Sequence, residues 1–232
     1  MKRFYKDVSV EQVDGGYRVL LDCRPIKTQM GRPQVVLSET LAHALAAEWA
    51  EQGEEIHPRK FLFRDHADFA IDIVGENRDD TIAKLLAFAE TDTLCYRADP
   101  DEPLYRRQQE DWEPLLCRLE EKHGVSFQRI SGVMHKPQPP ETIATLKAHL
   151  EQLDDFALAG TTALASLSAS LTIALLSDDD AVNDPMLLWR DANLEEEWQA
   201  DQWGREEEAE ERRRRKGDEF SAAYTFMLLA KS

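Results

Sequence analysis

A run without proline from Met186 to Lys216 constrains the fold of this chain more than any other feature. Strong helix formers fill the run, so it predicts a long helix. Glu196, Gln199, Ala200 and Trp203 are spaced three, four and seven residues from the first, which places them on one helix face. A core face is more uniformly apolar than this one. The face therefore either fills a polar position inside the protein or binds a partner.

Leu194, Trp198 and Asp201 share a second face of the same predicted helix. The residues that we predict to contact a partner are Glu195, Glu196, Trp198, Gln199 and Trp203. Further along, the basic run from Arg212 to Lys216 stands where a helix dipole favours cations, and Gly217 is a typical helix end. Such a run also occurs in nucleic-acid-binding proteins. The acids around it favour a helix end instead.

The overall charge separates classes of function. The chain has 232 residues and a net charge of −17, so one large domain or two small ones are expected. Nucleic-acid binding relies on phosphate neutralisation, and the acidic balance argues against it. Cys23, Cys95 and Cys117 show neither a metal-ligand spacing nor a disulfide pattern. A reducing compartment is the simplest interpretation.

The first part of the chain shows strand patterns and the remainder shows helical patterns. Val8 to Val13 alternates apolar and polar residues, and Asp14-Gly15-Gly16 predicts a turn into a return strand. Ser38 then resembles an N-cap, and Trp49 lies on the apolar stripe of the helix that follows. We therefore predict an α+β protein. It has a small N-terminal antiparallel β-rich domain, residues 1–58, and a larger all-helical domain, residues 59–232.

Three features of the helical part carry further predictions. Pro103 is expected to begin a helix, and Pro114 to interrupt or restart it. Phe156 to Leu176 is the longest apolar stretch, but hydroxyl residues within it and acids beside it favour one buried helix over a membrane span. The N-terminus shows no apolar signal region. No membrane insertion is predicted.

The sequence gives little support to an enzyme. Asp65, His66, Asp68 and Asp72 form the one cluster that could bind a metal or act as acid and base. A solvated acidic face or a set of caps is the commoner arrangement. Glycine-rich phosphate loops, Gly-x-Ser-x-Gly and His-Glu-x-x-His are absent from the sequence. We predict no catalytic residue, metal or cofactor, and we assign structural roles to Asp72, Trp49 and Trp112.

The ordered set of motifs resembles one family, the Atp-twelve assembly chaperones for the alpha subunit of the F-type ATP synthase. The resemblance runs almost end to end. It rests on these stretches: Arg3-Phe4-Tyr5-Lys6, Leu21 to Thr28, Leu41-Ala42, Ala47-Glu48-Trp49, Gln52, Ala70-Ile71-Asp72, Thr91 to Arg97, Gln108, Trp112, Pro114, Leu194-Glu195-Glu196, Gln199, Trp203-Gly204 and Ala209. Departures are conservative or local. Cys23 stands where the family has glycine, Gln29-Met30 replaces a proline-containing turn, and Glu195 and Glu206 replace aspartate.

The resemblance implies a β-rich N-terminal domain, a helical C-terminal domain and a chaperone function without nucleotide hydrolysis. Such a chaperone binds the unassembled alpha subunit transiently and covers the surface later buried against beta subunits. The family's important acidic residue matches Glu196, on the face already singled out. We expect a monomer in a bacterial cytoplasm, or in the mitochondrial matrix if the chain is a processed eukaryotic protein. A metal-dependent enzyme and a structural assembly subunit are the alternatives.

Overall fold

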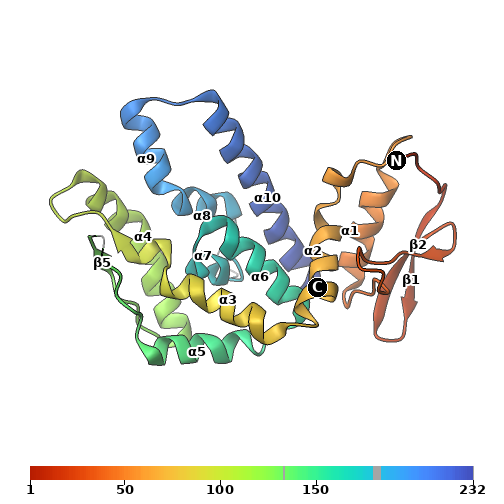
Figure 1. Cartoon of the computed structure of the whole chain (residues 1–232), viewed down its shortest axis with the longest axis horizontal. Coiled ribbons are helices and arrows are strands. Elements are labelled where there is room, and N and C mark those ends of the chain that lie inside the picture. The colour runs from red at the N-terminus through yellow and green to blue at the C-terminus, as the bar shows by residue number, and fades with distance from the viewer. Residues whose placement is uncertain (133, 180–183, 232) are drawn as a thin grey trace. The chain divides into compact units, whose positions relative to one another are not determined.

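The computed structural model describes residues 1–132, 134–179 and 184–231. A three-stranded antiparallel sheet comes first and most of the remaining elements are helices (Figure 1), which confirms the predicted α+β class. The elements are β1 Val8–Val13, β2 Gly16–Leu21, β3 Arg24–Pro25, α1 Glu39–Ala50, η1 Pro58–Lys60, α2 Leu62–Phe69, η2 Ala70–Val74, α3 Arg78–Glu90, η3 Thr93–Cys95, β4 Tyr96–Arg97, α4 Pro103–His123, β5 Ile130–Ser131, α5 Pro140–Leu150, α6 Asp155–Ser168, α7 Leu171–Leu176, α8 Pro185–Ala192, α9 Leu194–Trp203 and α10 Glu207–Lys231.

The chain divides into two compact units. The first unit comprises Met1–Arg78, Asp154–Gly160 and Ala222–Ser232, and the second comprises Asp79–Leu153 and Thr161–Ser221. This division follows spatial proximity rather than independent folding. The boundary predicted between residues 58 and 59 therefore stays a prediction.

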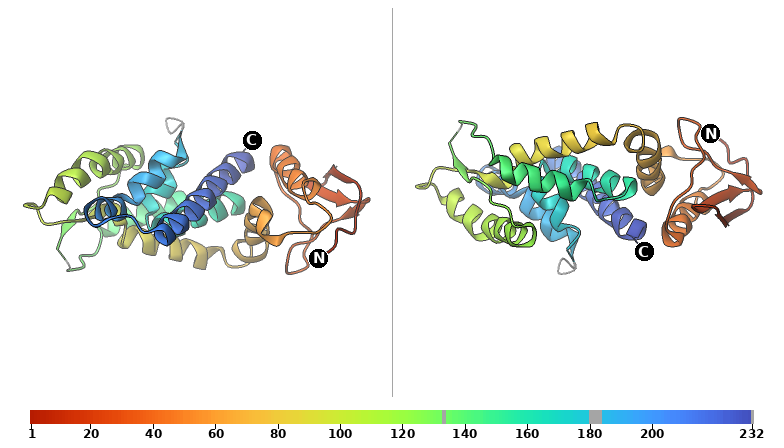
Figure 2. Two further views of the ribbon diagram at one scale, coloured as in Figure 1. Left: turned by 90° about the horizontal axis from the view of Figure 1, so that it is seen from above. Right: turned by 90° about the horizontal axis from the view of Figure 1, so that it is seen from below.

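The β1–β2 hairpin and α1 make up the start of the first unit. β1 pairs antiparallel with β2 through the register Val8↔Leu21 to Val13↔Gly16, as the alternating pattern predicted. Gly16 is required at the turn, because a Cβ there would lie 2.2 Å from the carbonyl oxygen of Val36. The views in Figure 2 show α1 beside the strands, and the helix contacts both of them. Ser38 caps α1 by accepting from the amide of Leu41 at 3.1 Å, as predicted.

The turn between β2 and β3 holds two residues with positive φ. Asp22 has φ of 47° and Cys23 has φ of 65°, a combination that glycine and asparagine adopt more readily. The carboxylate of Asp22 accepts hydrogen bonds from the amides of Lys6 and Asp7, both at 2.9 Å. Cys23 is exposed and its thiol is free. The hydrogen bonds of Asp22 explain why an aspartate stands in this turn, whereas no contact explains the cysteine at position 23.

We expect Cys23→Gly to stabilise the first unit by about 0.5 kcal/mol. Relief of roughly 1–2 kcal/mol of left-handed strain exceeds the roughly 0.5–1 kcal/mol entropic cost of glycine. Urea denaturation measures the difference. The matched control is Asp22→Gly, which relieves the same kind of strain but removes the carboxylate bonds to Lys6 and Asp7. A Cys23→Gly protein no more stable than wild type would mean that the backbone relaxes elsewhere.

Pro114 does not interrupt its helix, contrary to the prediction. α4 begins at Pro103, as predicted, and continues through Pro114 to His123, where Gly124 closes it with φ of 65°. Pro114 lies on the exposed side, so the carbonyl of Glu110 that loses its donor can be hydrated. The next residue on the opposite side, Leu116, is buried and holds the helix in place.

The predicted single helix from Phe156 to Leu176 is two helices. α6 ends at Ser168, Ala169 has φ of 50°, and α7 begins at Leu171. The break is stabilised by the fully buried carboxylate of Asp92, which accepts from Ser170 Oγ at 2.7 Å and from the amide of Thr172 at 2.8 Å. Among the residues described, no helix is both long enough and apolar enough to cross a membrane.

The long helix predicted from Met186 is also divided. α8 ends before Asn193, α9 ends at Gly204 with φ of 101°, and α10 runs through Gly217 to Lys231. Gly217 is thus no helix end. A Cβ there would lie 3.0 Å from the indole nitrogen of Trp189, so the glycine allows α10 to approach α8 closely. The basic run from residue 212 to 216 consequently lies inside a helix, and the helix-end interpretation of it is wrong.

Candidate partner-binding surface

The predicted mixed face of α9 lines a groove in the second unit. Glu196, Gln199, Ala200 and Trp203 contribute one wall, and the start of α10 contributes the other. The groove encloses about 410 Å³. Glu196 and Gln199 are exposed, and the Trp203 side chain is 82% exposed. Of the two roles considered for this face, the exposure favours partner binding over filling a buried polar position. The groove is lined by Glu196, Gln199, Ala200, Trp203, Gly204, Arg205, Glu206, Ala209, Glu210 and Arg213.

Two arginines tie α9 to α10. Arg213 of α10 lies 2.9 Å from a carboxylate oxygen of Glu197 and 2.6 Å from one of Glu210. Arg205, in the connection, lies 2.7 Å from Asp201 and 2.9 Å from Glu197. Glu197 therefore bridges both arginines. The hydrogen bonds that the Arg205 guanidinium donates to Asp201 and Glu197 raise its pKa. The Arg205–Asp201 pair is exposed and contributes little stability, whereas the Arg213 side chain is only 14% exposed and holds α10 against α9.

Glu196 sits at the edge of this ion-pair cluster. Its side chain is 67% exposed, and its nearest cation is Arg213, whose Nε lies 3.8 Å away. The shorter contacts of Arg213 go to Glu197 and Glu210. Most of the Glu196 side chain is thus open to solvent.

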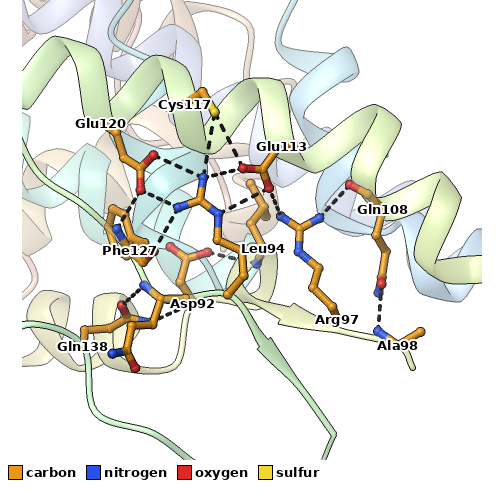
Figure 3. Close-up of polar contacts among 12 residues, drawn as sticks. Asp92, Leu94, Arg97, Ala98, Gln108, Glu113, Cys117, Glu120, Phe127 and Gln138 are labelled. Atoms are coloured by element: carbon orange, nitrogen blue, oxygen red, sulfur yellow. Dashed lines mark hydrogen bonds and ion pairs between the residues drawn. The ribbon is translucent and has the colours of Figure 1, made fainter. Parts of the chain in front are cut away.

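Glu195 faces away from the groove, toward α4. Its Oε1 accepts a hydrogen bond of 2.7 Å from Nε2 of Gln108, which is fully buried. Burial raises the pKa of the Glu195 carboxyl. Gln108 in turn accepts from Arg97 Nη1 at its backbone carbonyl (2.6 Å) and from the amide of Ala98 at its side chain (2.8 Å), and Figure 3 shows Arg97 and Ala98 directed toward Gln108. Glu195 therefore holds the start of α9 against α4.

Trp198 also lies outside the groove. It is partly buried in a second pocket of about 300 Å³, together with the residues predicted to share its helix face. That pocket is lined by Arg107, Asp111, Arg190, Asp191, Leu194, Glu197, Trp198 and Asp201. The five predicted contact residues thus separate into a groove set of Glu196, Gln199 and Trp203 and two residues directed elsewhere.

The two tryptophans given structural roles are buried. Trp112 is fully buried in α4, and its Nε1 donates to the carbonyl oxygen of Asp191 at 2.7 Å. Arg97 lies over its ring, 5.3 Å from the centroid. Trp49 is 8% exposed and packs against Phe61, with ring centroids 4.5 Å apart. These positions support the structural roles that were predicted.

Asp68 and Asp72 bind protein donors. Asp72 accepts from Thr28 Oγ1 at 2.7 Å and from the amide of Met30 at 3.1 Å. Asp68 accepts from the amide of Gln29 at 3.1 Å and from Gln34 Nε2 at 2.5 Å. The two carboxylates thus hold residues 28–34 against α2 and η2.

The other two members of the predicted cluster are His66 and Asp65, and Asp65 also contacts the loop by accepting from Gln29 Nε2 at 3.2 Å. His66 packs on the ring of Phe226, 5.2 Å between centroids, and burial lowers its pKa. Asp65 is exposed and accepts from Arg64 at 2.7 Å. Across the described ranges, no three His, Cys, Asp or Glu side chains are grouped so that they could hold a metal ion.

Sequence reasoning missed the residues that shape the groove from α10. Arg213 was predicted to lie at a basic helix end, and Glu210 was only one of the acids around it. Gln108 carried no predicted role, although it joins Glu195 across 87 positions of sequence. The signal for Arg213 was its distance of 16 and 17 residues from Glu197 and Glu196 of α9, which becomes meaningful only once the turn at Gly204 is known.

The comparisons with known proteins agree on one family. The sequence model of the family described as ATP12 chaperone protein matches residues 2–120. The mitochondrial protein atp12 of Schizosaccharomyces pombe is 27% identical over 223 residues, which cover 90% of this chain and 76% of that protein. The crystal structure of Atp12 from Paracoccus denitrificans is 33% identical, with a TM-score of 0.93 over 99% of this chain and 98% of that one. The crystal structure of the Atu1473 protein from Agrobacterium tumefaciens is 36% identical, with a TM-score of 0.92 over 97% of this chain and 85% of that one.

An α+β fold with an exposed, mixed helix face and a likeness to chaperones over nearly its whole length defines a binding protein of the chaperone class. The chain belongs to the ATP12 chaperone family, which confirms the resemblance found in its motifs. Membership assigns the protein to ATP synthase assembly and implies binding rather than catalysis.

Proposed function

We propose that the protein binds the unassembled alpha subunit of the F-type ATP synthase and shields the surface that later faces the beta subunits. The contact is made by the groove between α9 and α10. The observation that carries this proposal is the 82% exposure of Trp203 beside Glu196 and Gln199. Tryptophan is favoured as an anchor in protein interfaces, and holding it in water is unfavourable unless a partner covers it.

The groove suits a client surface with a cation next to an apolar area. Trp203 would cover the apolar area, Glu196 would pair with the cation, and Gln199 would bond to backbone groups between them. Trp and Arg side chains dominate the binding energy of such interfaces, while the surrounding polar contacts exclude water. Glu195 acts in this proposal through its bond to Gln108, which fixes the first turn of α9.

Direct binding measurements with purified alpha subunit test the groove. Trp203→Ala and Glu196→Lys are each expected to weaken binding by roughly tenfold or more, as loss of an interface anchor does. Because both side chains are exposed, the free energy of unfolding of each variant should lie within about 0.5 kcal/mol of the wild-type value. Isothermal titration calorimetry measures the affinity and urea denaturation measures the stability.

The matched control is Glu121→Lys, the same charge change at an exposed position of α4 outside the groove. It should bind like wild type. Equal weakening by Glu121→Lys and Glu196→Lys would mean that overall charge, and not the groove, governs binding. A large loss of stability in Glu196→Lys would make this residue structural.

We further infer that the protein works as a monomer in a bacterial cytoplasm and leaves the client on assembly. The net charge of −17 supports solubility as a single chain and disfavours nucleic-acid partners. A chaperone that dissociates is absent from the finished ATP synthase. Stoichiometric recovery with the purified enzyme would instead identify a structural subunit.

A further inference from the structure

A further pocket, separate from the α9–α10 groove and from the pocket around Trp198, lies in the first unit. It encloses about 450 Å³ beside the turn between β2 and β3. Its floor is apolar and its rim carries charges. The lining residues are Phe4, Tyr5, Leu21, Asp22, Arg24, Pro25, Ile26, Lys27 and Trp49.

The aromatic side of this pocket is already ordered. Phe4 and Tyr5 meet edge to face with ring centroids 5.3 Å apart, and Tyr5 and Trp49 do so at 5.6 Å. Tyr5 Oη donates to the backbone carbonyl of Trp49 at 2.7 Å, which fixes the order of the three rings. Tyr5 and Trp49 are buried, whereas Phe4 is 65% exposed at the rim. An apolar side chain can enter without rearranging the pocket, so little ordering entropy opposes binding.

The rim is positively charged. Arg24 and Lys27 are exposed, and neither side chain makes a hydrogen bond or ion pair with another described residue. The one acid of the rim, Asp22, is engaged by the amides of Lys6 and Asp7. Two cations are therefore free to pair with a bound molecule.

The sequence around the pocket is also positively charged, which favours an acidic binding partner. Residues 1–37 carry seven Lys and Arg against four Asp and Glu, a net charge of +3 in a chain whose net charge is −17. Two copies of this chain, each with a net charge of −17, repel one another. A second copy is therefore a poorer occupant than a separate protein that carries one acidic segment. Charge complementarity sets which partners approach and in which register.

We propose that this pocket binds an acidic segment of a partner protein through one apolar anchor residue. The anchor side chain enters between Phe4 and Ile26, and carboxylates on either side of it pair with Arg24 and Lys27. The surface is distinct from the groove proposed for the alpha subunit and does not depend on that proposal. The protein thus has two binding surfaces of opposite electrostatic character.

Fluorescence anisotropy with a defined peptide tests the pocket. The probe is fluorescein-Gly-Asp-Glu-Leu-Phe-Glu-Asp-amide, titrated with the full chain. We expect saturable binding, weakened by about tenfold or more in the double variant Arg24→Glu with Lys27→Glu and by roughly fivefold in Phe4→Ala. All three side chains are exposed, so the fold should persist, and circular dichroism checks this.

The control protein is Arg59→Glu with Lys60→Glu, the same charge change at two exposed positions of the first unit outside the pocket. It should bind the probe within about twofold of wild type, since exposed charges outside the pocket make no direct contact with the peptide and change its affinity little. A peptide with lysines for the acids, and one with glycines for Leu-Phe, should both fail to bind.

Three results would overturn the proposal. Equal weakening in both double variants would show non-specific attraction to charge. Undiminished binding of the glycine peptide would show that the pocket takes no anchor. A dimer in sedimentation that Phe4→Ala dissociates would assign the pocket to a second copy of the chain.

Discussion

Trp112→Ala is expected to destabilise the second unit by about 4 kcal/mol and to lower the melting temperature by roughly 10 °C. Trp112 has no exposed surface, so its removal leaves a cavity that neighbours cannot fill without moving. The variant also loses the bond from Nε1 to the carbonyl oxygen of Asp191, and Arg97 loses the ring beneath it. Calorimetry and urea denaturation measure the loss.

Trp203→Ala is the matched control for this prediction. The same side chain is removed from a position that is 82% exposed, so the stability should change by less than about 0.5 kcal/mol. The contrast between the two tryptophans separates a side chain that packs in the core from one that is exposed on the surface. A Trp112→Ala protein as stable as Trp203→Ala would contradict the packing of α4 described above.

Asp72→Ala is expected to destabilise the first unit by about 3 kcal/mol. The substitution leaves Thr28 Oγ1 and the amide of Met30 without their acceptor, and hydrogen bonds to a carboxylate contribute roughly 1.5–3 kcal/mol each. Urea denaturation measures the loss, and faster hydrogen exchange at the Met30 amide locates it.

Two further variants make the test of Asp72 specific. Asp72→Asn keeps an acceptor in place and should lose less than Asp72→Ala. Asp65→Ala removes an exposed carboxylate about two turns earlier and should change stability by less than about 0.5 kcal/mol. If Asp72→Ala left stability unchanged but a divalent metal stabilised wild type alone, the carboxylate would be a metal ligand and the structural role would be wrong.

Local sequence patterns correctly predicted the parts of the fold that depend only on residues close together in the sequence. The β1–β2 hairpin follows from alternation ending in Asp14-Gly15-Gly16, and the N-cap of α1 follows from Ser38 alone. The face of Glu196, Gln199 and Trp203 follows from helix periodicity and survives the division of the predicted long helix. Periodicity is local, so it places residues on a face without knowledge of the neighbouring elements.

The incorrect predictions share one physical cause, a three-dimensional environment that overrides a local rule. Pro114 is tolerated because its side of α4 faces water, and Gly217 continues α10 because Trp189 packs against it. The break between α6 and α7 at Ala169 is stabilised by Asp92, which is distant in the sequence and hydrogen-bonds to Ser170 and Thr172. The bond between Gln108 and Glu195 likewise has no local signature, so sequence could not tell which acid of α9 faces the groove.

Affinity capture from cell extract, with the tagged wild type and Glu196→Lys in parallel, tests the central claim most directly. Bound proteins are identified by mass spectrometry. Enrichment of the ATP synthase alpha subunit by wild type, and its loss from the folded variant, is the predicted result. Capture of the alpha subunit in equal amounts by both proteins would contradict the groove as the binding surface. Its absence from the wild-type capture would contradict the proposed client.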